Sequence, residues 1–198
     1  GYLRHFAELS GNASLKTTAY FNNFHRNWFK LDKVNGKSAY KEWDAPDFLA
    51  VVKGQAAGEL SNKANNRDYT SKGVESVLTY DLALGSLDNQ VKFGVRYHED
   101  EVNRLQWYQH YTQDANGNLS TAGPDAPSGK AGDRRQNTEA WSLYLEDRIA
   151  IKDKLIVTPG IRYESLDYSY DQNTRTPDKS PAAGTGDLDV VTGGLGLS

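Results

Sequence analysis

The sequence predicts an all-β protein, a segment of an antiparallel up-and-down transmembrane β-barrel. Three observations support this fold class. Runs of alternating apolar and polar residues are typical of strands that present two different faces. One face is apolar and ends in aromatic residues, whereas the opposite face carries charge, so water is expected where a soluble protein has its core. Short polar turns alternate with long polar loops, as in barrels whose hairpins are tight at only one end.

Residues 137–172 give the clearest example, because two alternating runs flank the polar turn KDK. This arrangement predicts a β-hairpin in which Ile151 lies opposite Leu155. One face then carries the pairs Ile149–Val157, Leu145–Ile161 and Leu143–Tyr163, and the other face carries Arg148–Thr158, Tyr144–Arg162 and Ser142–Glu164. The register also places Asp147 and Pro159 on the apolar face, and Pro159 predicts a bulge because proline cannot donate to the strand ladder.

A second hairpin is predicted for residues 69–111, around a four-residue turn SLDN. With Gly85 opposite Gln90, the outward pairs are Leu84–Val91, Leu82–Phe93, Tyr80–Val95 and Leu78–Tyr97. The same register places Glu75 opposite Asp100, which is an unfavourable pair of like charges.

A first hairpin is predicted for residues 1–30, with its turn near residues 10–13 and Leu9 opposite Leu15. A long loop over residues 31–68 follows. Within it, PDFLAVVK predicts a short helix capped by Asp44, started by Pro46 and ended by Gly54.

Two further polar segments are predicted to be loops. Residues 113–136 are rich in Gly, Pro, Ser, Asn and Asp and are expected to be mobile, and NTRTPDKSPAAGTG forms the second loop. The segment LDVVTGGLGLS is expected to form a last, incomplete strand. The prediction therefore comprises seven strands with short turns at one end and long loops at the other.

The composition narrows the possible functions. The 23 basic and 26 acidic residues are scattered, which makes nucleic acid an unlikely partner. Mean hydropathy is −0.72 and no apolar run is long enough for a membrane helix, but barrel strands need only every second residue to be apolar. The chain has no Cys, which excludes disulfides and thiol catalysis. It also has no Met and starts inside an expected strand, which predicts an internal fragment.

The motif TPGIRYE resembles the strand signature of TonB-dependent outer-membrane receptors. Three further motifs resemble the barrel of the ferric citrate type within that family: TTAYFNNFHRNWFKLD, NNRDYTSKGVES and FGVRYHEDEVNRLQW. The resemblance implies a barrel of about 22 strands closed around a plug. Residues 1–198 would be a partial barrel domain, with the plug, its energy-coupling box and the other strands outside it. It also implies a Gram-negative outer-membrane location, and three partners: a ferric chelate ligand, the lipid bilayer, and the TonB complex through the missing plug.

The resemblance directs attention to polar residues near the expected mouth of the barrel. Bulky anionic ferric chelates suit arginine, amide and aromatic groups. The candidate ligand-binding residues are Arg26, His98, Arg104, Gln106, Tyr108, Arg134 and Arg135. The competing interpretation is that each side chain solvates the barrel interior and pairs with a neighbouring carboxylate. Four outward aromatic residues are expected to form a girdle at the membrane interfaces: Tyr80, Tyr97, Trp141 and Tyr163.

No motif indicates an enzyme. The sequence has no HExxH, phosphate-binding glycine loop or GxSxG, and the DANGN segment fits a turn better than a calcium loop. No metal site and no cofactor are predicted, and iron is expected only within a chelate. Two alternatives remain open at this point: a passive porin, which needs no plug, and a soluble β-sandwich binding module, in which the apolar face would be a core.

Overall fold

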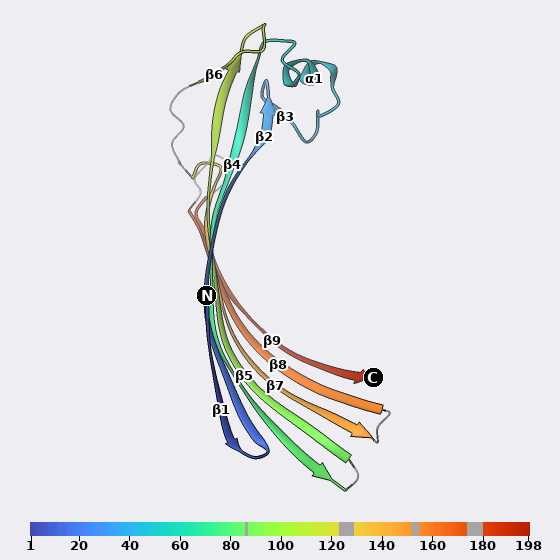
Figure 1. The fold of residues 1–198 in the computed structure, drawn as a ribbon. Coiled ribbons are helices and arrows are strands. Elements are labelled where there is room, and N and C mark those ends of the chain that lie inside the picture. Colours follow the sequence, from blue (N-terminus) through green and yellow to red (C-terminus); the bar gives the residue numbers. More distant parts are fainter. Residues whose placement is uncertain (86, 123–128, 152–154, 174–179) are drawn as a thin grey trace.

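The computed structural model describes residues 1–85, 87–122, 129–151, 155–173 and 180–198. It consists almost entirely of one antiparallel sheet in the order β1-β2-β4-β5-β7-β8-β9, with β3 paired to β2 and β6 paired to β5 (Figure 1). The main strands are β1 (Tyr2–Ser10), β2 (Ala13–Val34), β4 (Gly58–Leu84), β5 (Leu87–Gln113), β7 (Gly132–Ile151), β8 (Leu155–Gln172) and β9 (Ala182–Leu197); the short elements are β3 (Lys37–Ser38), α1 (Pro46–Val52) and β6 (Leu119–Thr121).

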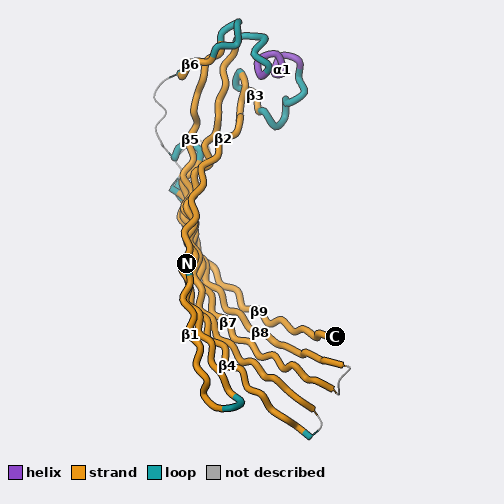
Figure 2. The backbone as a smooth tube through the Cα atoms, in the orientation of Figure 1, coloured by secondary structure: helices purple, strands orange, loops and turns teal. Residues whose placement is uncertain are grey.

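The sheet confirms the predicted fold class. Each main strand pairs with the previous main strand along the chain, which is up-and-down connectivity, and the seven predicted strands are present. The sheet is not closed, because β1 and β9 form its edges, and its lower part curves to one side (Figures 1 and 2). No second sheet packs on it among the described residues, so the β-sandwich alternative is wrong. The described part of the chain contains no helix with the length and apolar character needed to cross a membrane.

The predicted register of the β7–β8 hairpin is confirmed. Ile151 pairs with Leu155, Leu143 with Tyr163 and Tyr144 with Arg162. The ladder is interrupted beside Pro159, but it resumes in the same register, so the predicted bulge is absent. The predicted turn at residues 152–154 lies outside the described residues.

The predicted register of the β4–β5 hairpin is wrong by four residues. Leu84 pairs with Leu87, and Leu78 with Phe93, because the strands extend further toward the turn than the SLDN prediction assumed. Position 86 of that turn is not described, and Gly85 supplies a positive φ of 65° beside it. An even shift keeps each side chain on its predicted face. It also places Glu75 opposite Arg96, which removes the predicted like-charge pair.

The β1–β2 hairpin shows a similar difference, since Leu15 pairs with Ala7 rather than with Leu9. This shift of two residues again preserves the faces. The turn lies where it was predicted, between Ser10 and Ala13.

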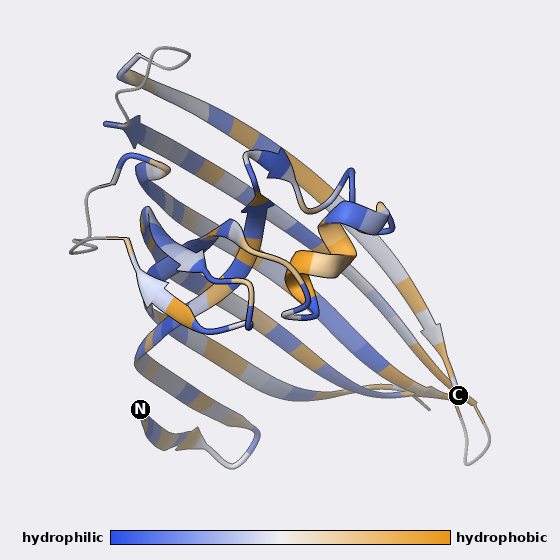
Figure 3. Cartoon of the chain, turned by 90° about the horizontal axis from the view of Figure 1, so that it is seen from above, coloured by the Kyte–Doolittle hydropathy of each residue, from blue (hydrophilic) through white to orange (hydrophobic). Residues whose placement is uncertain are grey.

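The long loop covers residues 35–57 and is shorter than predicted, because β2 and β4 continue past the expected strand ends. Its helix begins at Pro46, and Gly54 follows it with a φ of 72°, as predicted. Asp44 is not the cap, because Ala45 occupies the N-cap position without a side-chain hydrogen bond. The helix contributes Phe48 and Val51 to a small core with Val34 of β2, packed against Leu31 and Leu60. Apolar residues of this helix are orange in Figure 3.

The described parts of the polar segment 113–136 include strand residues at both ends. β6 pairs with the end of β5, and β7 already begins at Gly132. The DANGN segment forms a turn in which Asp114 Oδ1 accepts hydrogen bonds from the backbone N–H groups of Asn116 (2.8 Å) and Asn118 (2.9 Å). β9 likewise starts at Ala182, within the second predicted loop. Residues 123–128 and 174–179 of these loops lie outside the description.

Candidate functional site

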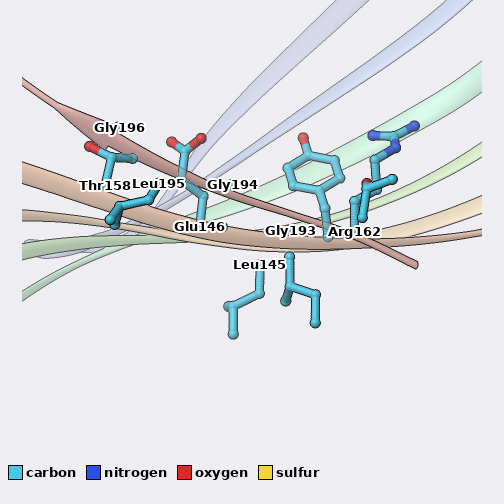
Figure 4. Close-up of a pocket in the computed structure, with 12 residues that line it drawn as sticks. Leu145, Glu146, Thr158, Arg162, Gly193, Gly194, Leu195 and Gly196 are labelled. Carbon is cyan, nitrogen blue, oxygen red and sulfur yellow. The ribbon is translucent and has the colours of Figure 1, made fainter.

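The two faces of the sheet have opposite chemistry. In β7 and β8, Glu146, Thr158 and Arg162 point to one side and Leu145 points to the other (Figure 4). Cross-strand pairing extends this division through every main strand. We call these the polar face and the apolar face.

The apolar face has no protein layer over it among the described residues. Phe93, Leu145 and Ile161 are 46–55% exposed although they lie mid-strand. The apolar positions of β5 extend from Leu87 to Tyr97, which is about 33 Å along the strand at 3.3 Å per residue and about 25 Å in height at a 40° tilt. This height matches the apolar band of an outer-membrane barrel.

Aromatic residues lie toward both ends of this band. The rings of Tyr97 and Trp141 are 4.9 Å apart at the end nearer the long loops, and Tyr163 donates to Asp189 Oδ1 (2.9 Å) close by. Tyr80 lies toward the short turns, opposite Val91. Beyond Tyr97 the same face becomes charged, with a Lys72–Glu99 ion pair of 2.6 Å. The positions fit the predicted girdle, which stays a prediction.

The polar face beside the apolar band carries mutually satisfied charges. Arg96 donates to the Tyr20 hydroxyl (2.9 and 3.1 Å), which also contacts His98 Nδ1, and His98 Nε2 lies 2.8 Å from Asp100. A second group joins Arg162 to Glu164 (2.6 Å). These contacts agree with the interpretation that such residues solvate the interior wall.

Tyrosine rings on the polar face lie over glycines of the neighbouring strand. A Cβ added at Gly94 would lie 2.1 Å from Tyr144 Cζ, and one at Gly73 would lie 2.4 Å from the Tyr20 hydroxyl. Each glycine and its tyrosine are direct cross-strand partners. The missing side chain therefore makes room for the ring, a known way of covering glycine in sheets.

Beyond the band, toward the long loops, four arginines align across four adjacent strands. Arg26 of β2 pairs with Arg67 of β4, Arg67 with Arg104 of β5, and Arg104 with Arg134 of β7. All four lie on the polar face, and we call them the arginine row. At about 4.8 Å between strands, the row is roughly 14 Å wide.

No carboxylate of the described residues neutralises the charges of the arginine row. No described Asp or Glu forms an ion pair with any of the four. Two unit charges about 6 Å apart repel by roughly 1 kcal/mol in water and by roughly 3 kcal/mol at an effective dielectric of 20. Burial, with Arg67 and Arg134 nearby, lowers the pKa of Arg104. Like charges directly opposite each other destabilise a sheet, so the row is costly without an anion.

Tyr69 lies beside the row and receives two of its hydrogen bonds. Its hydroxyl accepts from Arg26 (3.0 Å) and Arg67 (3.2 Å). The Arg67 hydrogen bond, reinforced by Arg26, lowers the pKa of the Tyr69 phenol. These contacts hold the guanidinium groups in place without cancelling their charge.

Several buried donors in or next to the row have no acceptor in the described part of the chain. The Nε atoms of Arg67 and Arg104 are buried without a hydrogen-bond partner among the described residues, and so is Asn65 Nδ2. Gln106, only 1% exposed, joins Arg104 to Asn65 through its amide. Buried donors normally have partners, and orphaned ones indicate an absent acceptor.

The structure brings together some of the predicted ligand-binding residues. Arg26, Arg104 and Arg134 belong to the row, and Gln106 lies directly beside it. Tyr108 is further along the same face, with Lys63 Nζ 5.6 Å from its ring centroid.

The two remaining predicted residues lie elsewhere. His98 belongs to the satisfied group near the apolar band. Arg135 is on the opposite face from Arg134 and forms an ion pair of 2.5 Å with Glu101, which lowers the pKa of that carboxyl.

Sequence reasoning missed Arg67 and Asn65, because both were assigned to the long loop. The segment NKANNRDYTS is polar almost throughout and lacks the apolar alternation that would have marked it as a strand. No three His, Asp or Glu side chains of the described residues are grouped to hold a metal ion.

A curved, open antiparallel sheet with an uncovered apolar band and a charged opposite face defines wall strands of a transmembrane β-barrel. The chain belongs to the TonB-dependent receptor family: the family model described as "TonB dependent receptor-like, beta-barrel" matches residues 2–198.

Solved structures support the fold. The siderophore receptor PiuA from Acinetobacter baumannii matches with a TM-score of 0.65 at 17% identity, over 99% of this chain and 28% of that chain. The ferric-catecholate import receptor Fiu from E. coli K12 matches with a TM-score of 0.61 at 11% identity, over 99% of this chain and 31% of that chain. BauA, the ferric preacinetobactin receptor from Acinetobacter baumannii, matches with a TM-score of 0.65 at 12% identity, over 99% of this chain and 27% of that chain. The chain thus spans less than a third of each of these three structures.

Proposed function

We propose that this chain forms part of the wall and mouth of an outer-membrane receptor that imports a ferric chelate. The arginine row carries the proposal, because it is a concentrated positive charge on the polar face beyond the membrane band. Family membership supplies the architecture in which such a face lines the interior of a barrel. The full receptor would lie in a Gram-negative outer membrane and receive energy from the TonB complex through a plug.

The residues of this chain have three parts in the mechanism. The apolar face holds the wall in lipid, and the satisfied groups around Arg96 and Arg162 keep the interior wall wet and rigid. The arginine row and Gln106 bind the ligand near the mouth by charge-assisted hydrogen bonds. No covalent step is required, so the site acts by binding and release.

Ferric citrate is the specific ligand that we propose first, on the motifs of the ferric citrate type. The matched structures are named for siderophores, ferric catecholates and ferric preacinetobactin, so other ferric chelates fit the same architecture. A passive porin is the second candidate, because its strands would need the same polar interior and no plug.

The experiment measures uptake of radioactive iron, supplied as ferric citrate, by Gram-negative cells that produce the full-length receptor, with and without a functional TonB. We expect uptake that saturates with ligand and requires TonB. Uptake that rises linearly and continues without TonB would favour the porin, and no uptake despite normal surface production would contradict the import proposal.

A further inference from the structure

We propose that His98 and its neighbours on the polar face form a pH-sensitive switch. Protonation of His98 moves the Arg96 side chain from a tyrosine hydroxyl to the carboxylate of Glu75. The switch belongs to the interior wall and does not depend on which ligand the receptor imports. It is carried by the direction of the hydrogen bonds around His98 and by the cross-strand position of Glu75.

The hydrogen bonds around His98 run in one direction. Arg96 can only donate, and it donates to the Tyr20 hydroxyl from Nε (3.1 Å) and Nη2 (2.9 Å). The hydroxyl hydrogen of Tyr20 is therefore left for His98 Nδ1, which lies 2.5 Å away. The ionised Asp100 carboxylate can only accept, so His98 Nε2 donates to it (2.8 Å). His98 is thus neutral in this arrangement, with its ring hydrogen on Nε2.

A proton added to His98 finds no acceptor in this arrangement. It would bind to Nδ1, which faces the Tyr20 hydroxyl and Arg96 Nη2 (3.1 Å). Both groups direct a donor hydrogen at Nδ1, and Arg96 also carries a positive charge. Protonated His98 keeps Asp100 as its partner, so the change is confined to the Nδ1 side. There the Tyr20 hydroxyl must turn to accept a hydrogen bond, and Arg96 must move away.

Glu75 is placed to receive Arg96. It lies directly opposite Arg96 in the β4–β5 ladder and forms no ion pair within the described part of the chain. Its carboxylate accepts a long hydrogen bond of 3.4 Å from the Tyr144 hydroxyl. Direct cross-strand partners have Cβ atoms about 5 Å apart, so rotation of the Arg96 side chain brings its guanidinium to this carboxylate without movement of the strands.

The other charged groups nearby do not take the place of Glu75. Glu164 already pairs with Arg162 (2.6 Å), and the ladder partners of His98, Gly73 and Ala140, cannot ionise. The titratable and charged groups that face His98, Arg96 and Glu75 are Arg4 of β1, Lys16 and Tyr20 of β2, Asp100 of β5, Tyr144 of β7, and Arg162 and Glu164 of β8.

The switch changes which strands the Arg96 side chain joins. Tyr20 reaches β5 by crossing β4 above Gly73, where an added Cβ would lie 2.4 Å from the Tyr20 hydroxyl. In the neutral state Arg96 therefore connects β5 to β2, and in the protonated state it connects β5 to β4. Imidazole changes its charge between about pH 5 and pH 8, so the charge pattern of this wall would follow the acidity of the water beside it.

The test measures the coupling of Arg96 to its two acceptors by urea unfolding of the full-length receptor in lipid vesicles, at about pH 8 and about pH 5.5. One double-variant cycle combines Arg96→Gln with Tyr20→Phe, and the other combines it with Glu75→Gln. Both cycles are repeated with His98→Gln, which cannot be protonated. Glu146→Gln with Arg96→Gln is the matched control, because Glu146 is a carboxylate of the same face that pairs with Lys92 (3.1 Å).

We expect the two couplings to change in opposite directions on acidification. The coupling of Arg96 to Glu75, expressed in the unfolding equilibrium constant, should rise by about five- to tenfold, which is the range for one hydrogen bond gained. The coupling of Arg96 to Tyr20 should fall by a similar factor. Neither should change with pH in the His98→Gln background, and the Glu146 control should show no coupling to Arg96 at either pH.

Couplings that are the same at both pH values, or that change equally with His98→Gln, overturn the switch. A second measurement tests the neutral state directly, by NMR of the receptor with nitrogen-labelled histidine. The His98 signal is identified by its loss in His98→Gln. At about pH 8 its ring hydrogen should be on Nε2, and a hydrogen on Nδ1 would contradict the proposed direction of the hydrogen bonds. Folding of every variant is checked by its migration before and after boiling in SDS.

Discussion

The contact between Gly94 and Tyr144 allows a quantitative prediction for Gly94→Ala. The added Cβ would lie 2.1 Å from Tyr144 Cζ, whereas nonbonded carbons require about 3.5 Å, so the ring would have to move by roughly 1.5 Å. Its other side is occupied, since Arg162 lies 5.6 Å from the ring centroid. Overpacking of this kind costs about 1–3 kcal/mol, and replacing glycine in a strand returns about 0.5–1 kcal/mol. We expect a net loss of about 1–2 kcal/mol.

Gly160→Ala provides the control. Gly160 also lies on the polar face of a strand with neighbours on both sides, but an added Cβ would meet Leu145 O at 3.6 Å and Glu146 Cβ at 4.0 Å, both ordinary contacts. This variant should be neutral or slightly more stable. The assay is urea unfolding of the full-length receptor in lipid vesicles, followed by tryptophan fluorescence.

The decisive comparison is the double variant with Tyr144→Ala. Without the ring, Gly94→Ala should cost nothing, so the coupling between the two sites should be about 1–3 kcal/mol. A cost of Gly94→Ala that is the same with and without Tyr144, or a cost equal to that of Gly160→Ala, would refute the steric reasoning.

Two further predictions concern the loop core and the strand register. Gln113→Ala removes the side chain that donates to the carbonyls of Val51 and Ala56 (both 2.7 Å), so limited proteolysis should cut the 35–57 loop faster. The control Gln109→Ala should leave the cleavage rate unchanged. Equal cleavage rates for the two variants would count against the role of Gln113 in holding the loop. Residues 1–198 contain no cysteine, so any cysteine elsewhere in the full-length receptor is first replaced by serine. Leu78→Cys with Phe93→Cys should then form a disulfide on oxidation, and Leu82→Cys with Phe93→Cys should not. The reverse result would restore the rejected register.

The faces of the sheet could be predicted from the sequence, whereas the alignment of residues across strands could not. Face assignment depends only on odd and even positions, so the four-residue error at the β4–β5 turn left Leu78 and Phe93 outward. The β7–β8 register was correct because apolar residues bound its turn closely on both sides. At the β4–β5 turn, SLDN contains favoured turn residues, yet Leu87 already belongs to the strand.

The arginine row could not be predicted from the sequence either, because it depends on the register between strands. Its alignment needs three correct registers, and the predicted β4–β5 register would have placed Arg104 opposite Ser71 rather than Arg67. Beyond the membrane band the strands also lose their apolar alternation, so β4 was mistaken for loop up to residue 68. The predicted Glu75–Asp100 pair was the one sequence signal that the register needed correction.

The central claim is that these strands cross a lipid bilayer with one face in lipid and the other in water. In a full-length receptor in vesicles, with any cysteine outside residues 1–198 replaced by serine, single cysteines from Val91 to Tyr97 of β5 can each carry an environment-sensitive fluorophore. Val91, Phe93 and Val95 should report lipid and respond to a membrane-soluble quencher. Lys92 and Arg96 should report water and respond to a water-soluble quencher. Alternation with a period of two residues supports the account, and uniform exposure along the segment would contradict it.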